Sequence, residues 1–361
     1  MIQNRSKVMI TGSGNLARCI CFIMTSCTEH MDVVLVARNR SALKWIVSAS
    51  SAKQAIFGSS LSFSAEVIDW SSPGRLEELI GKHRPDVIIH TASVQSPWSL
   101  TPGSRWGRLV KEVGFGLTTA LNGCLLYRLQ SAVGKESSQT VIINACYPDA
   151  VNPLMDSQIP NLLTGMGNVA IIAAMLKADR ELCDKRLQVI AGHYDVAQLI
   201  KDVKNAKYLN VWADGVKTQI NPERFLRLPA DSELNWVTAA CVIPQLLAFL
   251  RKKDLFYGHI PGIFGYPGGY PVVVRDGEPE LDLPIEVHVD EVVQNNRAVL
   301  ESEGIIISEE GEVSYTDKAK DTLKQYSPTA LSSFKGDDVE LAAEELIRFR
   351  EDLMSEAGER L

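Results

Sequence analysis

The first 150 residues alternate short apolar runs with stretches of helical spacing. The apolar runs are rich in β-branched residues, as buried parallel strands are: "KVMITGSG", "DVVLVARN", "LSFSAEVIDW", "PDVIIHTAS" and "QTVIINACYPD". The stretches between them predict helices over 15–27, 41–56, 74–83 and 105–132. Strands that alternate with helices are typical of α/β proteins with a doubly wound parallel sheet, so residues 1–150 fit one nucleotide-binding domain.

After residue 150 the pattern changes to long helices and isolated strands. Helices are expected over 164–186, 233–254 and 289–305, and strands over 187–196, 206–215 and 217–222. Residues 270–289 resemble an antiparallel hairpin with "RDGE" at its turn. Residues 151–335 therefore predict an α+β second domain. Residues 336–361 predict an appended amphipathic helix, whose apolar stripe is Leu341, Leu346, Phe349 and Leu353; it covers either the body of the protein or an oligomer face.

Composition narrows the class of protein. The 361 residues leave room for two packed units, and a net charge of −7 argues against a nucleic-acid surface. The seven cysteines are scattered without metal-ligand spacing, which favours reduced thiols in a cytoplasmic protein, and the histidines show no metal-ligand spacing either. The apolar stretch at 16–27 is too short for a membrane span, which needs about 20 residues. We therefore expect a small-molecule substrate, with no metal, nucleic acid or membrane partner.

The sequence "GSGNLA" follows the first strand and opens a helix. It supplies Gly12, Gly14 and Ala17 in the G-x-G-x-x-A pattern of Rossmann-type dinucleotide-binding domains. Gly12 permits the tight turn, Gly14 lets a pyrophosphate approach backbone N–H groups, and Ala17 lets the helix pack closely on the strand. The alternative is an ordinary glycine-rich turn between a strand and a helix.

The end of the second strand indicates which cofactor is preferred. An NAD site places an acid there for the ribose 2′-hydroxyl, but this chain has Ala37 followed by Arg38 and Arg40. Arginine suits a 2′-phosphate, so we expect NADP(H) to be preferred, with NAD(H) as the alternative. The competing interpretation is that both arginines are solvated loop cations.

These motifs together resemble the lactate/malate dehydrogenase superfamily over roughly residues 7–325. The further matching segments, in order, are "HTASVQSPWSLTPGSRW", "NACYPD", "GMGN", the Gly192–His193 pair and "GIFGYPGGYPVVV". The resemblance implies that Asn144 binds the nicotinamide side and the substrate oxygen, that His193 is the acid/base, and that Arg105 polarises the same oxygen. The cofactor contacts expected are Gly12, Ser13, Gly14, Asn15, Leu16, Arg38, Arg40, Thr91, Ala92 and Asn144. Arg105 is equally interpretable as a loop cation, and Asn144 as a turn residue.

The chain differs from the family at the two positions whose side chains bind the substrate carboxylate and orient the histidine. The family carries an aspartate and, three residues on, an arginine; those positions here hold Ile171 and Ala174. An unpaired buried carboxylate costs several kcal/mol, so lactate, malate and their keto acids are disfavoured. His193 needs another orienting group, for which Asn168, Asp149 and Asp195 are candidates; otherwise the site is a relic. His90 is a second, less favoured proton donor.

The sequence thus predicts an NADP-dependent oxidoreductase that acts on a C=O or C–OH group of a non-standard substrate. The rivals are an imine reductase of a specialised pathway and a non-catalytic NADP(H)-binding protein, which fold analogy alone does not separate. We also expect a homo-oligomer, a dimer, since "NWVTAACVIPQLLAFL" is apolar enough for an interface, although it equally suits the core.

Overall fold

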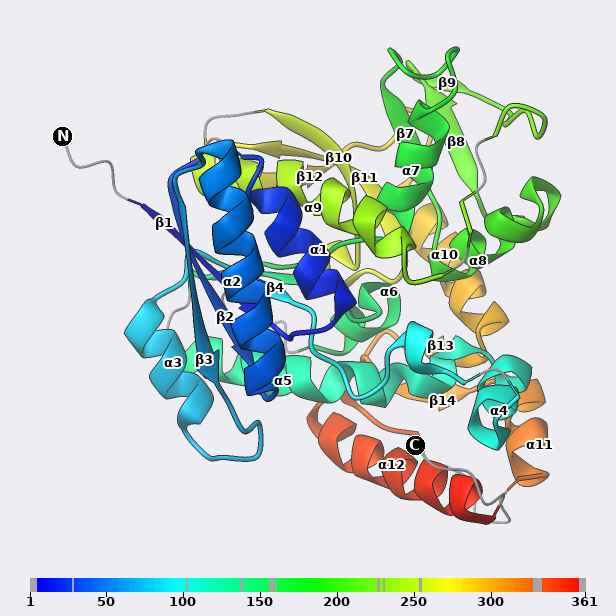
Figure 1. The fold of residues 1–361 in the computed structure, drawn as a ribbon. Helices are drawn as coiled ribbons and strands as arrows, with labels where there is room; N and C mark the ends of the chain where they lie inside the picture. Colours follow the sequence, from blue (N-terminus) through cyan, green and yellow to red (C-terminus); the bar gives the residue numbers. More distant parts are fainter. Residues whose placement is uncertain are drawn as a thin grey trace.

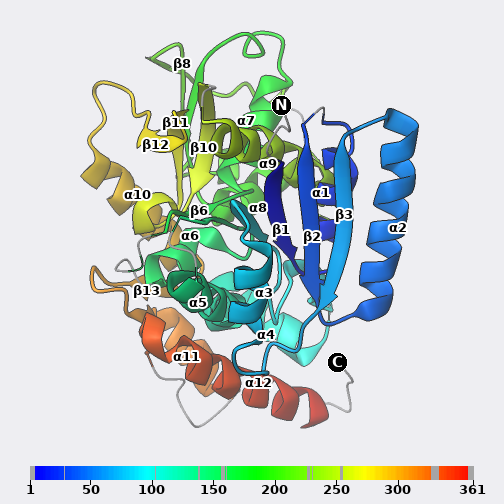
Figure 2. The ribbon, with the colours of Figure 1, turned by 90° about the vertical axis from the view of Figure 1, so that its left-hand side faces the viewer.

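The first half of the chain forms a parallel sheet of six strands (Figures 1 and 2). The computed structural model describes residues 5–27, 29–101, 103–136, 139–155, 159, 161–225, 228–229, 231–252, 255–326 and 333–356. The strand order is β3-β2-β1-β4-β5-β6. The strands are β1 (Ser6–Thr11), β2 (Met31–Ala37), β3 (Leu61–Val67), β4 (Val87–His90), β5 (Val141–Asn144) and β6 (Leu163–Gly165). This is the doubly wound order of dinucleotide-binding folds, as the sequence predicts.

Alternating side chains of the strands pack against helices on the two faces of this sheet. Val8 and Ile10 join the core formed with α1 (Asn15–Met24), α2 (Arg40–Phe57) and α9 (Leu234–Arg251). Met9 faces the opposite core, formed with α3 (Arg75–His83), α4 (Arg105–Val113) and α5 (Thr119–Glu136). Both faces are therefore covered, and the carboxyl ends of the strands are left as the place for a ligand.

The second half contains three smaller sheets and several helices. The sheets are β7-β8-β9 (Leu187–Ile190, Asn210–Ala213, Val216–Lys217), β10-β11-β12 (Phe256–Pro261, Gly269–Arg275, Glu278–Leu281) and β13-β14 (Ile305–Ile307, Val313–Tyr315). The hairpin expected at "RDGE" joins β11 to β12 through Asp276 and Gly277, both at positive φ, as a tight turn between antiparallel strands requires. The helices are α6 (Pro148–Val151), α7 (Val169–Lys177), α8 (His193–Lys201), α10 (Val289–Ser302) and α11 (Asp317–Lys324).

Several sequence-based boundaries differ from the structure: the helix expected over 164–186 is limited to α7, the strand expected over 217–222 to β9, and three further differences bear on the site. The helical region expected over 105–132 breaks at Gly114, where φ is +118°, and a short 3₁₀ turn over Phe115–Thr118 separates α4 from α5. The strand expected over 187–196 ends at Ile190, so His193 is the first residue of α8 rather than a loop residue. The parallel sheet continues into β6, beyond the expected boundary at residue 150, because Leu163–Gly165 pairs with β5.

The appended C-terminal segment forms α12 (Val339–Glu356), which packs against α5 and α4 below the sheet (Figure 1). Leu346 and Leu353 are each 2% exposed, whereas Leu341 is 66% exposed and lies outside the apolar stripe expected for it. Phe349 packs edge-on against Trp106 of α4. The helix therefore covers the body of the protein; the last five residues of the chain lie outside the described part.

Within the described part of the chain, α9 is the one helix whose length and apolar character would suit a membrane span. Its inner face packs against α1 and α7, and more than half of it is buried inside the protein. That burial is what a core helix requires.

Candidate active site

A cavity of about 690 Å³ lies at the carboxyl ends of the sheet strands and extends to the start of α8. This volume is within the range typical of ligand sites, roughly 300–1,000 Å³. Its walls come from the turn after β1, the ends of β2 and β4, the starts of α7, α8 and α9, and residues of α5. The glycine-rich turn and His193 therefore share one cavity, although they lie far apart in the sequence.

The glycine-rich turn has the geometry that a pyrophosphate needs. A Cβ at Gly12 would lie 2.5 Å from Thr91 Oγ1, and φ at Gly12 is +110°, so no other residue fits there. A Cβ at Gly14 would meet nothing within 4 Å, which shows open space over this residue. Gly14 precedes α1 without any side-chain cap, so the first N–H groups of the helix are left for an anion.

Most of the residues expected to contact the cofactor line this cavity. They are Gly12, Ser13, Gly14, Asn15, Leu16, Arg38, Thr91 and Ala92. Arg38 is exposed directly after β2 and lies near the carboxylate of Asp69. Arg40, in contrast, is the first residue of α2, is exposed and does not line the cavity. Of the two arginines, only Arg38 therefore lines the cavity.

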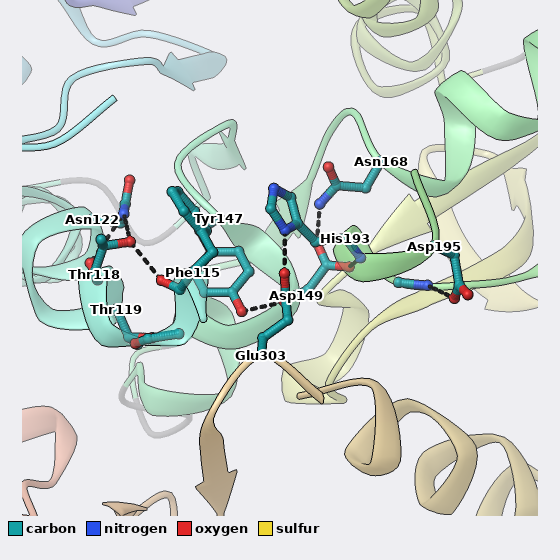
Figure 3. Close-up of polar contacts among 12 residues, drawn as sticks. Phe115, Thr118, Thr119, Asn122, Tyr147, Asp149, Asn168, His193, Asp195 and Glu303 are labelled. Carbon is teal, nitrogen blue, oxygen red and sulfur yellow. Dashed lines mark hydrogen bonds and ion pairs between the residues drawn. The ribbon is translucent and has the colours of Figure 1, made fainter. Parts of the chain in front are cut away.

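The imidazole of His193 is held by a carboxylate that sequence reasoning missed (Figure 3). His193 Nδ1 lies 2.5 Å from Glu303 Oε1, and the Tyr147 hydroxyl donates to Glu303 Oε2 at 2.5 Å. The side chain of Glu303 is 5% exposed, so this is a largely desolvated ion pair when the imidazole is protonated. Nε2 has no partner among the described residues and belongs to a side chain that lines the cavity.

Two aromatic rings fix the plane of the imidazole. The ring of Phe115 stacks on His193 with centroids 4.8 Å apart, and Tyr147 approaches it edge-on at 5.1 Å. Burial lowers the pKa of His193, but the carboxylates of Glu303 and Asp149 outweigh that effect, so the pKa lies above its ordinary value. The site therefore favours the protonated imidazole, which is a proton donor.

The three residues considered as orienting groups for His193 have other roles. Asp149 accepts the backbone N–H of His193 at 3.0 Å and also bonds the side chain of Asn168. Asp195 accepts the N–H of Gly192 at 3.1 Å, which caps the start of α8. Burial raises the pKa of Asp149 and that of Asp195 to about 6 each. These groups position the backbone at His193, whereas Glu303 contacts its ring.

Asn144 and Arg105 do not line the cavity in this structure. Asn144 is fully buried; its Oδ1 accepts from the Cys146 N–H, and its Nδ2 donates to Asn152 Oδ1 at 2.8 Å. Both polar atoms of its side chain are thus hydrogen-bonded to residues that follow β5. The guanidinium of Arg105 lies 6.0 Å from the ring centroid of Tyr326 instead. Neither side chain therefore lines the cavity, and the roles in substrate binding implied for both residues stay predictions.

His90 is a structural histidine. It is fully buried, its Nδ1 lies 2.8 Å from Thr11 Oγ1, and burial lowers its pKa to about 3. A ring that stays neutral and does not line the cavity is unsuited to donate a proton there, in agreement with the interpretation favoured from sequence.

The walls near His193 are mainly apolar. Ile171 and Val196 line the cavity, whereas Ala174 does not. Among the described residues that line it, Arg38 and His193 are the only ones with basic side chains, and none is acidic. The arrangement therefore offers no arginine near His193 for a substrate carboxylate.

Glycines explain how Glu303 reaches the histidine. A Cβ at Gly114 would lie 2.2 Å from the Glu303 carbonyl oxygen, and the Gly116 N–H donates to that oxygen at 3.0 Å. The 3₁₀ turn between α4 and α5 thus packs its backbone directly on the end of α10. The "GFG" within an otherwise helical stretch and the "EG" after a helix are the signals in the sequence, but neither indicates the partner of the other.

No family model and no curated protein sequence matches the chain, but solved structures share its fold. Malate dehydrogenase from Cryptosporidium parvum has a TM-score of 0.52 and 17% identity, covering 83% of this chain and 96% of that one. Lactate dehydrogenase from the same organism, complexed with lactic acid and β-nicotinamide adenine dinucleotide, has a TM-score of 0.52 and 17% identity over 83% and 99%. Malate dehydrogenase from Aeropyrum pernix has a TM-score of 0.52 and 14% identity, covering 82% of this chain and 98% of that one. The chain has the fold of lactate and malate dehydrogenases, so the expected fold class is confirmed.

Proposed function

We propose that the protein is an NADP-dependent oxidoreductase and a divergent member of the lactate/malate dehydrogenase superfamily. It transfers hydride between the nicotinamide and a C=O or C–OH group of a substrate other than lactate or malate. The observation that carries the proposal is the His193–Glu303 pair, at 2.5 Å, in the same cavity as the glycine-rich turn.

The residues of the cavity fit a dinucleotide. The N–H groups at the start of α1 would hold the pyrophosphate, and the open space over Gly14 admits it. When bound, the nicotinamide supplies or accepts the hydride. The protein's own contribution is proton transfer at His193 Nε2, because Glu303 occupies Nδ1. Glu303 acts as a positioning residue: it fixes the ring and stabilises the protonated form that reduction of a carbonyl consumes.

The cofactor preference rests on Arg38. Its guanidinium would bind a 2′-phosphate by charge-assisted hydrogen bonds, each worth about 1.5–3 kcal/mol. Arg38→Ala should therefore raise the Kd for NADPH by roughly 10–100-fold and leave that for NADH nearly unchanged. Arg40→Ala is the matched control, because Arg40 does not line the cavity. Equal losses for both cofactors in Arg38→Ala would remove the basis for NADP preference.

Catalysis is tested with a panel of neutral aldehydes, ketones and cyclic imines, followed by NADPH absorbance at 340 nm. We expect turnover that His193→Gln lowers by about 10²–10⁴-fold while NADPH binding, measured by fluorescence titration, is kept. Turnover confined to the imines would favour the rival imine reductase. Binding of NADPH without turnover of any compound would favour the non-catalytic alternative.

We also propose that the protein acts in the cytoplasm as a homodimer. Phe22 of α1, Trp45 of α2 and Trp236 of α9 form an aromatic cluster in which Trp45 is 52% and Trp236 42% exposed. Exposed aromatic groups of this kind are typical of interfaces. Trp45→Glu should give a monomer in sedimentation velocity, whereas Ile285→Glu, on a fully exposed residue outside the cluster, should not. A monomeric wild-type protein would contradict this proposal.

A further inference from the structure

We infer that Asn122 selects the substrate by accepting a hydrogen bond, and that the substrate is a neutral carbonyl compound carrying an N–H or O–H group close to the reacting carbon. This inference rests on the proposed function, since it deepens the assignment of the same cavity. It identifies a hydrogen-bond acceptor that would bind the substrate in place of the carboxylate-binding arginine, which this chain lacks.

The orientation of the Asn122 amide is fixed by its neighbours. Nδ2 donates to the backbone carbonyl of Thr118 at 3.0 Å and to Thr118 Oγ1 at 3.0 Å. Because a backbone carbonyl only accepts, the nitrogen must face Thr118, and Oδ1 is the opposite end of the amide (Figure 3). The structure gives Oδ1 no partner among the described residues.

The side chain of Asn122 is buried but belongs to the cavity. Asn122 is 2% exposed and is one of the residues that line the cavity, together with Leu125 one turn further along α5. Oδ1 is not among the described side-chain oxygens that are fully buried without a partner, so it is reached from the cavity. A ligand that donates to Oδ1 would gain a hydrogen bond worth about 1 kcal/mol, whereas one that presents only acceptors or an anion would not.

A chain of contacts connects Asn122 to the histidine. Thr118 Oγ1 accepts from Asn122 and donates to the carbonyl oxygen of Phe115 at 2.8 Å, and the Phe115 ring stacks on His193. The short turn over Phe115–Thr118 therefore positions both the Asn122 amide and the aromatic ring that packs on His193.

The surrounding charges also disfavour a carboxylate in this part of the cavity. Three buried carboxylates contact Gly192 and His193: Glu303 the ring, Asp149 the backbone N–H of His193, and Asp195 that of Gly192. No lysine or arginine among the described lining residues lies at this end, since Arg38 follows β2. A substrate anion would find the one positive charge at this end, on protonated His193, already paired with Glu303, whereas an N–H or O–H group meets an acceptor.

The test uses product-like alcohols bound to the protein saturated with NADPH, a complex that does not react. Isothermal titration would compare mandelamide, N,N-dimethylmandelamide and mandelate. We expect mandelamide to bind about tenfold more tightly than its dimethyl derivative, as one hydrogen bond predicts, and mandelate to bind most weakly. In Asn122→Leu the two amides should bind equally. Thr118→Val, which disturbs the same network but keeps Oδ1, should retain the difference.

Four results would overturn the inference. They are tighter binding of mandelate than of mandelamide, equal binding of both amides by the wild type, no binding of either amide, and an effect of Asn122→Leu on NADPH affinity alone. The last would assign Asn122 to the cofactor. Because this experiment needs no turnover, its failure is distinct from failure of the proposed function, which the 340 nm assay reports.

Discussion

Replacing Glu303 with glutamine tests the proton-transfer role of His193 without changing the shape of the site. The rings of Phe115 and Tyr147 still hold the imidazole, at centroid distances of 4.8 and 5.1 Å, so the main loss is the charge on Glu303. Two unit charges about 4 Å apart interact by about 4 kcal/mol at an effective dielectric constant of 20. Loss of all of that energy from the transition state would lower the rate by about 10³-fold, which is the upper limit. We therefore expect kcat for reduction to fall by roughly 10²–10³-fold.

The pH profile of the same variant gives a second, independent measurement. In the wild type the pKa of His193 is raised above its ordinary value, so reduction is fastest at low pH and declines as pH rises through that pKa. In Glu303→Gln, burial dominates and lowers the pKa, so the decline should begin at lower pH. Tyr147→Phe keeps the carboxylate and should shift the decline much less.

An unchanged kcat and an unchanged pH profile in Glu303→Gln would refute this reasoning, provided that the variant melts at the wild-type temperature. A loss of activity that leaves the pH profile in place would show that Glu303 supports the structure rather than the protonation of His193. Recovery of both quantities in Glu303→Asp would support the positioning role.

Three further predictions concern stability and are checked by urea unfolding. Burial raises the pKa of Asp149 from 3.8 to about 6, so the folded state binds a proton more tightly than the unfolded state does. The stability that this group contributes below pH 4 is therefore lost as pH rises through about 6. Asp149→Asn should remove about 3 kcal/mol from the pH dependence of the free energy of unfolding. Gly114→Ala should destabilise the protein by about 1–3 kcal/mol more than Gly103→Ala, because both have positive φ but only the former meets a neighbouring backbone. Leu346→Ala should cost about 2–5 kcal/mol and Leu341→Ala less than about 0.5, since only Leu346 is buried.

Local patterns predicted the parallel sheet and its glycine-rich turn well. The β-branched runs and the turn at Gly12 depend on neighbours in the sequence, so periodicity and residue type are enough to find them. The same holds for α12 and for the hairpin at Asp276. Its two central residues take positive φ, which Asp-Gly favours.

Contacts between residues far apart in the sequence could not be predicted, because no local pattern specifies them. Glu303 contacts His193 across a separation of 110 residues, and its own surroundings look like an ordinary helix end. Asn144 shows the opposite case, since its local motif matches the family but its Nδ2 donates to Asn152, a contact that the motif does not indicate. Arg105 likewise lies near Tyr326, a residue just after α11 that is distant in the sequence.

The distance along the chain between His193 and Glu303 also affects how activity arises during synthesis. A ribosome-bound chain that ends before residue 303 already contains the whole nucleotide-binding sheet and the histidine, but not its carboxylate. Under the proposed function, such a nascent chain would lack the group that stabilises the protonated histidine. Onset of turnover would therefore report synthesis of the last sixth of the polypeptide, which begins near Glu303.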